Sequence, residues 1–140
     1  MSESLDVIKQ LNQDVPQFIK LLGGRVTAVD YDNLVCTFEF NIGREYCHSI
    51  DVVQGGFVTA MLDAAMSHAI FAVDPTVVGV SSLEIKTSFL EATRAGKLTV
   101  TGKVIKAAYK TAFFEGHITN SDGLLAATAS SVAKLVRNRQ

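Results

Sequence analysis

Two adjacent glycines, Gly55 and Gly56, open a long apolar segment that contains one carboxylate, Asp63. The pattern predicts a helix from about residue 55 to residue 73, stopped by the Asp74-Pro75 pair. A helix N-terminus presents unpaired N–H groups and the positive end of the helix dipole, and glycine lets a ligand approach that backbone. An isolated carboxylate among apolar residues is costly to desolvate unless it is paired or used. The segment therefore offers both an oxyanion donor and a base.

Asp63 shares one narrow stripe of the predicted helix with Gly56, Thr59 and Ser67, because successive residues turn by about 100°. This stripe carries no Lys, Arg or Glu, whereas a solvated helix face usually carries several charges. The pattern favours a site over the alternative, in which Asp63 marks the solvated side of an amphipathic helix and the glycines only make a turn. His68 lies roughly 140° from Asp63 around the helix, which excludes a Ser-His-Asp relay between these two residues.

The rest of the chain predicts the elements that position this helix. Apolar residues at three-to-four spacing predict a helical segment over residues 4–22, which restarts at Pro16. One long helix between a hairpin and four further strands indicates the α+β class, with a curved antiparallel sheet wrapped around the helix. The last strand has small, nearly uncharged residues on both faces and is expected to be buried. Alternation of apolar and polar residues places the strands at 25–30, 34–40, 81–90, 97–106, 111–120 and 125–136.

Length, composition and charge limit the possible classes of protein. The 140 residues, 48% of them hydrophobic, predict a single domain over residues 1–140, in which residues 1–23 form an N-terminal helical segment. The formal net charge of -1 and the dispersed Lys and Arg residues give no concentrated basic face, so we expect no nucleic acid partner. No apolar run approaches the roughly 20 residues of a membrane-spanning helix, and the first residues lack the features of a signal peptide. We therefore expect no membrane partner and a cytoplasmic location.

The cysteines and histidines do not predict a metal site. Cys36 and Cys47 lack CxxC spacing and are expected to be free, reduced thiols. His48, His68 and His117 are scattered along the chain and do not form a metal-ligand spacing. We therefore expect neither a metal nor a separate cofactor.

Two motifs carry a resemblance to a known family. The spacing His48-(x6)-Gly55-Gly56-(x6)-Asp63, with the segment from Phe89 to Leu98, resembles the hot-dog fold acyl-CoA thioesterases of the phenylacetate-pathway (PaaI-like) group. That family typically shows Asn-(x6)-Gly-Gly-(x6)-Asp and a strand with a Phe-Leu-Arg-Pro-like end that leads to a glycine. The resemblance covers about residues 24–136. It implies a hot-dog fold and hydrolysis of a small or medium acyl- or aroyl-CoA, in which coenzyme A is part of the substrate.

The resemblance also implies roles for single residues. The Gly55 N–H would polarise the thioester carbonyl and stabilise the oxyanion. Asp63 would act as the general base for water or as the nucleophile. Ser82 matches the position that helps hold the attacking water in some members. Two positions depart from the family pattern, because His48 stands where Asn is usual and Gln54, rather than His, precedes the glycines; both side chains can donate a hydrogen bond to the thioester or to water.

Other residues are candidates for substrate binding. Pocket depth is expected to depend on Val58, other residues of the central helix and neighbouring strand residues. Cations near turns and the chain end could bind the phosphates of coenzyme A, although most such charges are simply solvated. The candidates are Gly56, Phe57, Thr59, Met61 and Ser67 for the acyl group, and Arg94 and Lys110, with Lys97, Lys106, Arg137 and Arg139 also available, for the phosphates.

Spacing along the helix bears on the oligomeric state. Gly55 and Asp63 are eight residues apart, roughly 12 Å along one helix at 1.5 Å per residue. This separation is too long for both to act on one carbonyl, so two copies of the helix must face each other. In the family the two groups come from different subunits. We therefore expect self-association into a homodimer, and the resemblance implies further assembly into a homotetramer.

Two other functions remain open at this point. A hot-dog hydratase or dehydratase would use a His and an acid, for which His48 and Asp63 are available, but segment 48–63 lacks the prolines of the fatty-acid dehydratase pattern. A non-catalytic acyl-CoA-binding module is the second alternative. Regulators of that kind carry an added DNA-binding segment, for which the chain has no spare length.

Overall fold

The computed structural model describes residues 2–138, and from residue 5 onward it also describes the side chains. Two N-terminal helices precede a hairpin, a long helix and four further strands, in the predicted order. The elements are α1 (Ser2–Asp14), α2 (Gln17–Leu21), β1 (Gly24–Asp30), β2 (Val35–Ile42), the 3-10 turn η1 (Arg44–Tyr46), α3 (Gly55–Val73), β3 (Val77–Phe89), β4 (Gly96–Ala107), β5 (Thr111–Asn120) and β6 (Leu125–Arg137).

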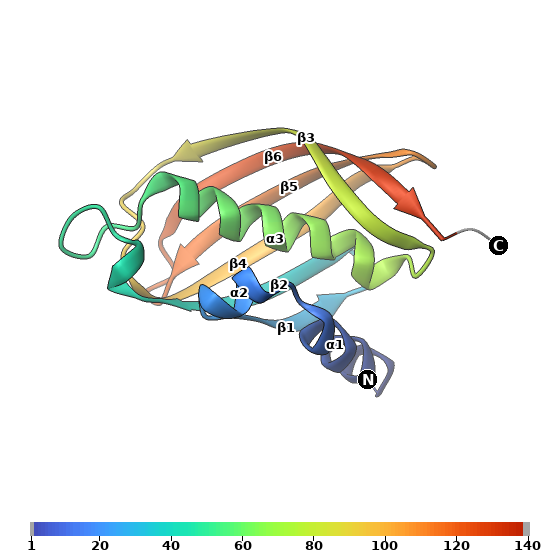
Figure 1. Cartoon of the computed structure of the whole chain (residues 1–140), viewed down its shortest axis with the longest axis horizontal. Coiled ribbons are helices and arrows are strands. Elements are labelled where there is room, and N and C mark those ends of the chain that lie inside the picture. Colours follow the sequence, from blue (N-terminus) through green and yellow to red (C-terminus); the bar gives the residue numbers. More distant parts are fainter. Residues whose placement is uncertain (1, 139–140) are drawn as a thin grey trace.

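The strands form one antiparallel sheet in the order β1-β2-β4-β5-β6-β3. Figure 1 shows α3 running along the inside of this curved sheet, with α1 and α2 near β1 and β2. The strand that follows the helix in sequence, β3, is therefore an edge strand, and its pairing partner is the last strand, β6. The predicted α+β class, with a curved sheet wrapped around one central helix, is confirmed.

The core lies between α3 and the concave face of the sheet. In β4, Leu98, Val100 and Val104 are buried, whereas the alternate residues Thr99 and Lys103 are exposed. The predicted burial of the last strand is also confirmed on one of its faces, where Ala127, Ala129, Ser131, Ala133 and Leu135 are all buried. Since a strand turns alternate side chains to opposite faces, these rows define the face that α3 covers.

Two paired glycines bring α3 close to the sheet. Gly102 of β4 lies opposite Gly116 of β5. A Cβ atom on Gly102 would overlap the Ala65 carbonyl group of α3, and a Cβ on Gly116 would come within 3.0 Å of the Met66 Cγ atom. The sheet thus has a shallow groove at this pair, and the backbone of α3 lies over it.

The N-terminal helix covers the β1 edge through one side chain. The Asn12 Nδ2 group donates to the Val26 carbonyl at 2.9 Å, and the Val26 N–H donates to Asn12 Oδ1 at 2.7 Å. Val26 is fully buried. The amide of Asn12 thus satisfies both backbone groups of Val26, as a neighbouring strand would.

Some predicted boundaries differ from the structure. The segment predicted as one helical region over 4–22 forms two helices, with Pro16 as the N-cap of α2. Strand β3 begins at Val77 rather than residue 81, because the Val77–Val80 stretch already pairs with the end of β6. We predicted that no apolar run approaches membrane-spanning length, and this prediction is wrong for α3. Among the described residues, α3 is the one helix whose length and composition would allow it to cross a membrane. More than half of it is buried inside the fold, as is usual for a core helix.

Candidate functional site

The N-terminus of α3 has one capped and one free amide. Gln54 is the N-cap, and its Oε1 atom accepts a hydrogen bond from the Gly56 N–H at 2.7 Å. The N–H groups of Phe57 and Val58 bond to the Gln54 carbonyl. No partner for the Gly55 N–H is found within residues 2–138. The cap therefore leaves Gly55 as an available donor at the positive end of the helix.

A cavity of about 470 Å³ opens at this helix end. Gly55 and Val58 of α3 form one side of it, and the end of β3 with the segment that follows forms another. The Phe89 ring lies against Gly55, since a Cβ on that glycine would be 3.2 Å from the Phe89 Cζ atom. The full lining is His48, Val52, Val53, Gly55, Val58, Phe89, Leu90, Glu91, Ala92 and Thr93.

His48 lies at the same cavity as Gly55, on a loop that is tied to the segment after β3. Its ring Nδ1 atom is 2.8 Å from the Ser49 hydroxyl, and its backbone N–H donates to the Val52 carbonyl. Val52 forms a β-bridge with Arg94, and the Arg94 guanidinium contacts Asp51 at 2.7 Å. With Nδ1 occupied by Ser49, the Nε2 side of the exposed His48 ring is the side available to a ligand.

Asp63 and Ser82 form the second part of the candidate site. The Ser82 hydroxyl, on β3, donates to Asp63 Oδ1 on α3 at 2.8 Å. Asp63 is half-buried, and neither residue lines the cavity at Gly55. The structure therefore brings Asp63 and Ser82 together, and separately brings His48 and Gly55 together. The two pairs do not meet within one chain.

The polar stripe on α3 is only partly solvent-facing. The Thr59 hydroxyl lies 2.9 Å from the Thr87 hydroxyl of β3, and Ser67 is half-buried. Gly56 is exposed, but its N–H is bonded to Gln54. The stripe is thus directed toward β3, the edge strand, rather than toward the middle of the sheet.

The apolar substrate-binding candidates take two different positions. Met61 is fully buried in the core and does not line the cavity. Phe57 is 37% exposed and packs edge-on against Tyr46, with ring centroids 4.9 Å apart. Tyr46 also donates a hydrogen bond to the Leu21 carbonyl, which fixes it beside the start of α3.

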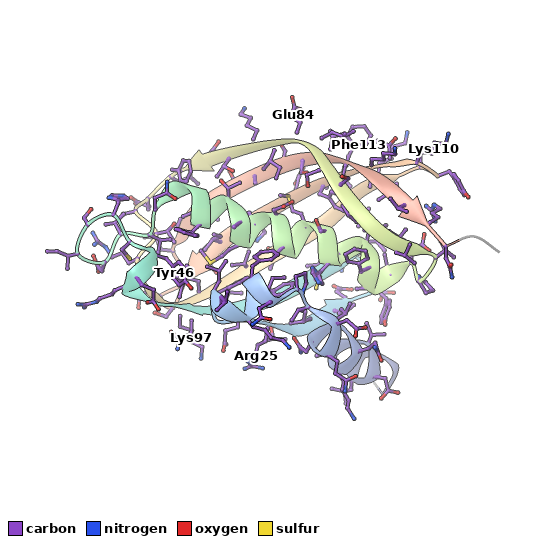
Figure 2. The ribbon with its side chains drawn as sticks, viewed as in Figure 1. Arg25, Tyr46, Glu84, Lys97, Lys110 and Phe113 are labelled. Atoms are coloured by element: carbon purple, nitrogen blue, oxygen red, sulfur yellow. The ribbon has the colours of Figure 1, made fainter. Side chains whose placement is uncertain are left out.

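The first two cationic candidates, Arg94 and Lys110, lie at different ends of the molecule, and Arg139 lies outside the described residues. Arg94 is beside the cavity and keeps a 61% exposed side chain despite its contact with Asp51. Lys110 is exposed in the connection between β4 and β5. Figure 2 shows Lys110 and Tyr46 toward opposite ends of the folded molecule. Lys110 is therefore remote from the start of α3 in the same protomer.

The remaining titratable groups of interest do not line the cavity. Burial lowers the pKa of His68, whose Nδ1 atom is 2.8 Å from the Ala64 carbonyl and whose ring packs edge-on against Phe38 and Phe71. Cys36 and Cys47 are free, as predicted. No cluster of three or more His, Cys, Asp or Glu that could hold a metal ion is found in the described part of the chain.

Sequence reasoning missed several cavity residues. Glu91 and Thr93 were not among the candidates, although both follow Phe89 in the segment that carried the family resemblance. Glu91 is exposed and Thr93 is 3% exposed. The sequence pointed to these two residues only through their position shortly after Phe89, because neither belongs to a periodic or charge pattern of its own.

Comparisons with known proteins agree on one family and one fold. A model of the thioesterase superfamily matches residues 51–127. Solved structures with the same arrangement include a phenylacetic acid degradation-related protein from Ralstonia eutropha JMP134, with 24% identity over 91% of this chain and 98% of that chain and a TM-score of 0.82. The PaaI protein of E. coli is 15% identical over 96% and 94% of the two chains, with a TM-score of 0.81. Zebra fish thioesterase superfamily member 2 is 21% identical over 95% and 99%, with a TM-score of 0.78.

These likenesses are all below 25% identity and therefore establish the fold alone, which is the predicted hot-dog fold. No curated protein matches the sequence significantly.

Proposed function

Because the chain belongs to the thioesterase superfamily, a family of thioester hydrolases, we propose that it hydrolyses a small or medium acyl- or aroyl-CoA to the free acid and coenzyme A. The observation that carries the proposal is the Gly55 N–H at the start of α3, which has no partner among the described residues and belongs to a residue that lines a cavity of about 470 Å³. A thioester carbonyl placed against this amide would be polarised by the N–H and by the helix dipole.

Hydrolysis then requires a base for water, and Asp63 is the proposed base. Its carboxylate accepts the Ser82 hydroxyl at Oδ1, which leaves Oδ2 for a water molecule. Asp63 would take a proton from the water while the water oxygen bonds to the carbonyl carbon. The resulting oxyanion is held by the Gly55 N–H, and its collapse breaks the C–S bond and releases the thiolate, which takes up a proton. Direct attack by Asp63, through an anhydride that water then hydrolyses, is the variant of this scheme.

His48 and Gln54 have distinct parts in this scheme. The Nε2 side of His48 is free to hydrogen-bond to the thioester or to water at the cavity. Gln54 acts through its helix cap, because its Oε1 atom binds the Gly56 N–H and so directs the open amide position to Gly55. Asn at position 48 and His at position 54, which are usual in the family, would make different hydrogen bonds.

Asp63 and Gly55 are proposed to meet across a dimer interface formed by β3. This strand has 13 residues and pairs through one edge with β6, so its other edge presents unpaired backbone groups. Val78, Leu83 and Phe89 on it are 58%, 66% and 56% exposed. A long, exposed, apolar edge strand favours association with another strand. Antiparallel pairing with the partner's β3 would set the two α3 helices side by side in opposite directions, so that Asp63 of one approaches Gly55 of the other.

Two substitutions test the chemistry separately. Asp63→Asn is expected to lower kcat by about 10²–10⁴ on a panel of acyl- and aroyl-CoA thioesters, measured by thiol release. Gly55→Pro removes the N–H donor and keeps the helix, because proline suits the first position of a helix and Gln54 already has an extended ψ of 139°. The expected decrease in kcat for Gly55→Pro is about 10²- to 10³-fold. Gly55→Ala is the matched control, since it keeps the N–H and adds the same Cβ near Phe89. Unchanged hydrolysis by Asp63→Asn would refute the proposal.

Mixing the two inactive variants tests the shared site. A mixed dimer contains one Gly55→Pro subunit and one Asp63→Asn subunit. If each site takes Gly55 from one subunit and Asp63 from the other, one of the two sites in this dimer has both residues unchanged. If both residues come from the same subunit, neither site does. With a shared site, co-refolding equal amounts should restore about a quarter of the parent activity, because about half of the dimers are mixed and each has one good site. No restoration, with dimers confirmed by light scattering, would mean that both groups act within one chain.

A further inference from the structure

One residue that lines the cavity at Gly55 has a buried hydroxyl group with no partner among the residues that the structure describes. Thr93 lines this cavity and is 3% exposed. Its Oγ1 atom is fully buried and forms no hydrogen bond within the described residues. Buried hydroxyl groups nearly always have a partner, because leaving one unpaired is costly. An orphan hydroxyl in the wall of a cavity is therefore a position where a ligand group can supply the missing partner.

Backbone hydrogen bonds hold the segment around Thr93 in place. The Val53 N–H donates to the Thr93 carbonyl at 2.8 Å, and the Ala95 N–H donates to the Asp51 carbonyl at 2.7 Å. Upstream, the N–H groups of Leu90 and Glu91 both bond to the Ala126 carbonyl. These contacts fix the backbone position of Thr93 and leave its hydroxyl group uninvolved.

The chemistry of the cavity wall restricts what the hydroxyl can bind. Most of the wall is apolar, and its other polar side chains, His48 and Glu91, are exposed. Thr93 is therefore the buried polar side chain among the residues that line the cavity. Ligand sites commonly combine an apolar wall with a few placed polar groups that fix orientation. The exposed Glu91 carboxylate would repel an anion, so the complementary group is a neutral donor or acceptor.

We infer that Thr93 is a substrate-binding residue, whose hydroxyl hydrogen-bonds to a neutral polar group of the thioester bound at Gly55. This inference rests on the proposed function. The group is either an amide of the pantetheine arm, present in every CoA thioester, or a hydroxyl or carbonyl substituent on the acyl part. Both present the same hydrogen-bonding chemistry, and the two sources are separated by the choice of ligand.

The test compares three variants by calorimetry, with thioether analogues of acyl-CoA that cannot be hydrolysed. Thr93→Val removes the hydroxyl at constant shape, and Thr93→Ser keeps it. Thr101→Val is the matched control, because Thr101 also has a buried, unpartnered hydroxyl but lies on β4 between Val100 and Gly102, with its side chain on the sheet face away from α3. Three analogues are used: one with an unsubstituted acyl group, one with a hydroxylated acyl group, and one unsubstituted analogue whose thiol arm lacks both amides.

Loss of one hydrogen bond between neutral groups should weaken binding about 2- to 12-fold in Thr93→Val, while Thr93→Ser and Thr101→Val stay within about 2-fold of the parent. If Thr93→Val binds both analogues with a complete CoA arm more weakly than the parent does, but binds the analogue without amides equally well, the hydrogen bond is made to pantetheine. If Thr93→Val binds only the hydroxylated analogue more weakly, the bond is made to the acyl part. If Thr93→Val binds each of the three analogues as tightly as the parent does, the inference is overturned. Because binding is measured without turnover, this result is distinct from failure of the proposed hydrolysis, which the Asp63→Asn kinetics report.

Discussion

Replacing Asn12 with alanine is expected to lower the free energy of unfolding by about 2 kcal/mol. The substitution removes the two hydrogen bonds that the Asn12 amide makes with Val26, at 2.9 and 2.7 Å, and leaves the backbone N–H and C=O of a fully buried residue without partners. Two such losses amount to roughly 2–3 kcal/mol. The better helix propensity of alanine in α1 offsets about 0.5 kcal/mol of this.

The expected shift in melting temperature follows from the size of the chain. The entropy of unfolding is about 2.1 cal/mol/K per residue, or about 0.3 kcal/mol/K for a chain of this length, so a loss of about 2 kcal/mol lowers Tm by about 7 °C. Thermal unfolding followed by circular dichroism measures this change. Each variant is measured at two protein concentrations, because self-association adds a concentration-dependent contribution to stability.

Gln10→Ala is the control for the Asn12 experiment. Gln10 lies on the same helix and donates to Asp14 at 2.7 Å, but this bond is exposed to solvent. Its loss should change the stability by less than about 0.5 kcal/mol. If Asn12→Ala melts within about 1 °C of the parent, the amide of Asn12 does not act as the partner of the β1 edge, and the reasoning is wrong.

Two further predictions concern titratable groups that do not line the cavity. Burial raises the pKa of the Cys36 thiol to about 12, so iodoacetamide at about pH 8 should modify the half-buried Cys47 in the folded protein and leave Cys36 intact; equal modification of both in peptide mass spectra would contradict this. The Thr76 side chain, assisted by Arg137, holds the pKa of Asp74 below its ordinary value of 3.8. The resulting stabilisation is complete above that value and is lost as the pH falls through the lowered pKa. The stability difference between parent and Thr76→Val should therefore shrink in acid, and a difference independent of pH in denaturant titrations would count against the role of Asp74.

The central helix and most strands could be predicted from the sequence, because the residue patterns that mark them lie within each segment. The helix has glycines at its start and the Asp74-Pro75 pair at its end, and the strands alternate at period two. The first residues of β3 were missed because Val77 to Val80 do not alternate apolar and polar side chains. Their strand conformation comes from pairing with β6, at the other end of the chain.

Prediction of the site was less complete for the same physical reason. Gly55 and Asp63 could be selected from one segment, because their positions on a helix follow from counting residues. Thr93 could not be selected, since its burial depends on contacts between its segment and residues near Val53, distant in sequence. Gln54 was considered a possible donor to the thioester or to water, and the helix cap that its oxygen makes in the structure was not predicted. A side-chain cap depends on backbone angles that residue type alone does not determine.

The glycine pair under α3 has a consequence for how the chain tolerates mutation. Gly102 and Gly116 lie in the middle of the sheet, remote from the cavity lining, yet a side chain on Gly102 would overlap the backbone of α3 at Ala65. Relief of that overlap would lift the helix as a rigid body and move Gly55 and Asp63 together. In a saturation library, intolerant positions should therefore form two separate groups, one around the chemistry and one beneath the helix. The second group would be mistaken for a distant regulatory site if position alone were used to interpret the data.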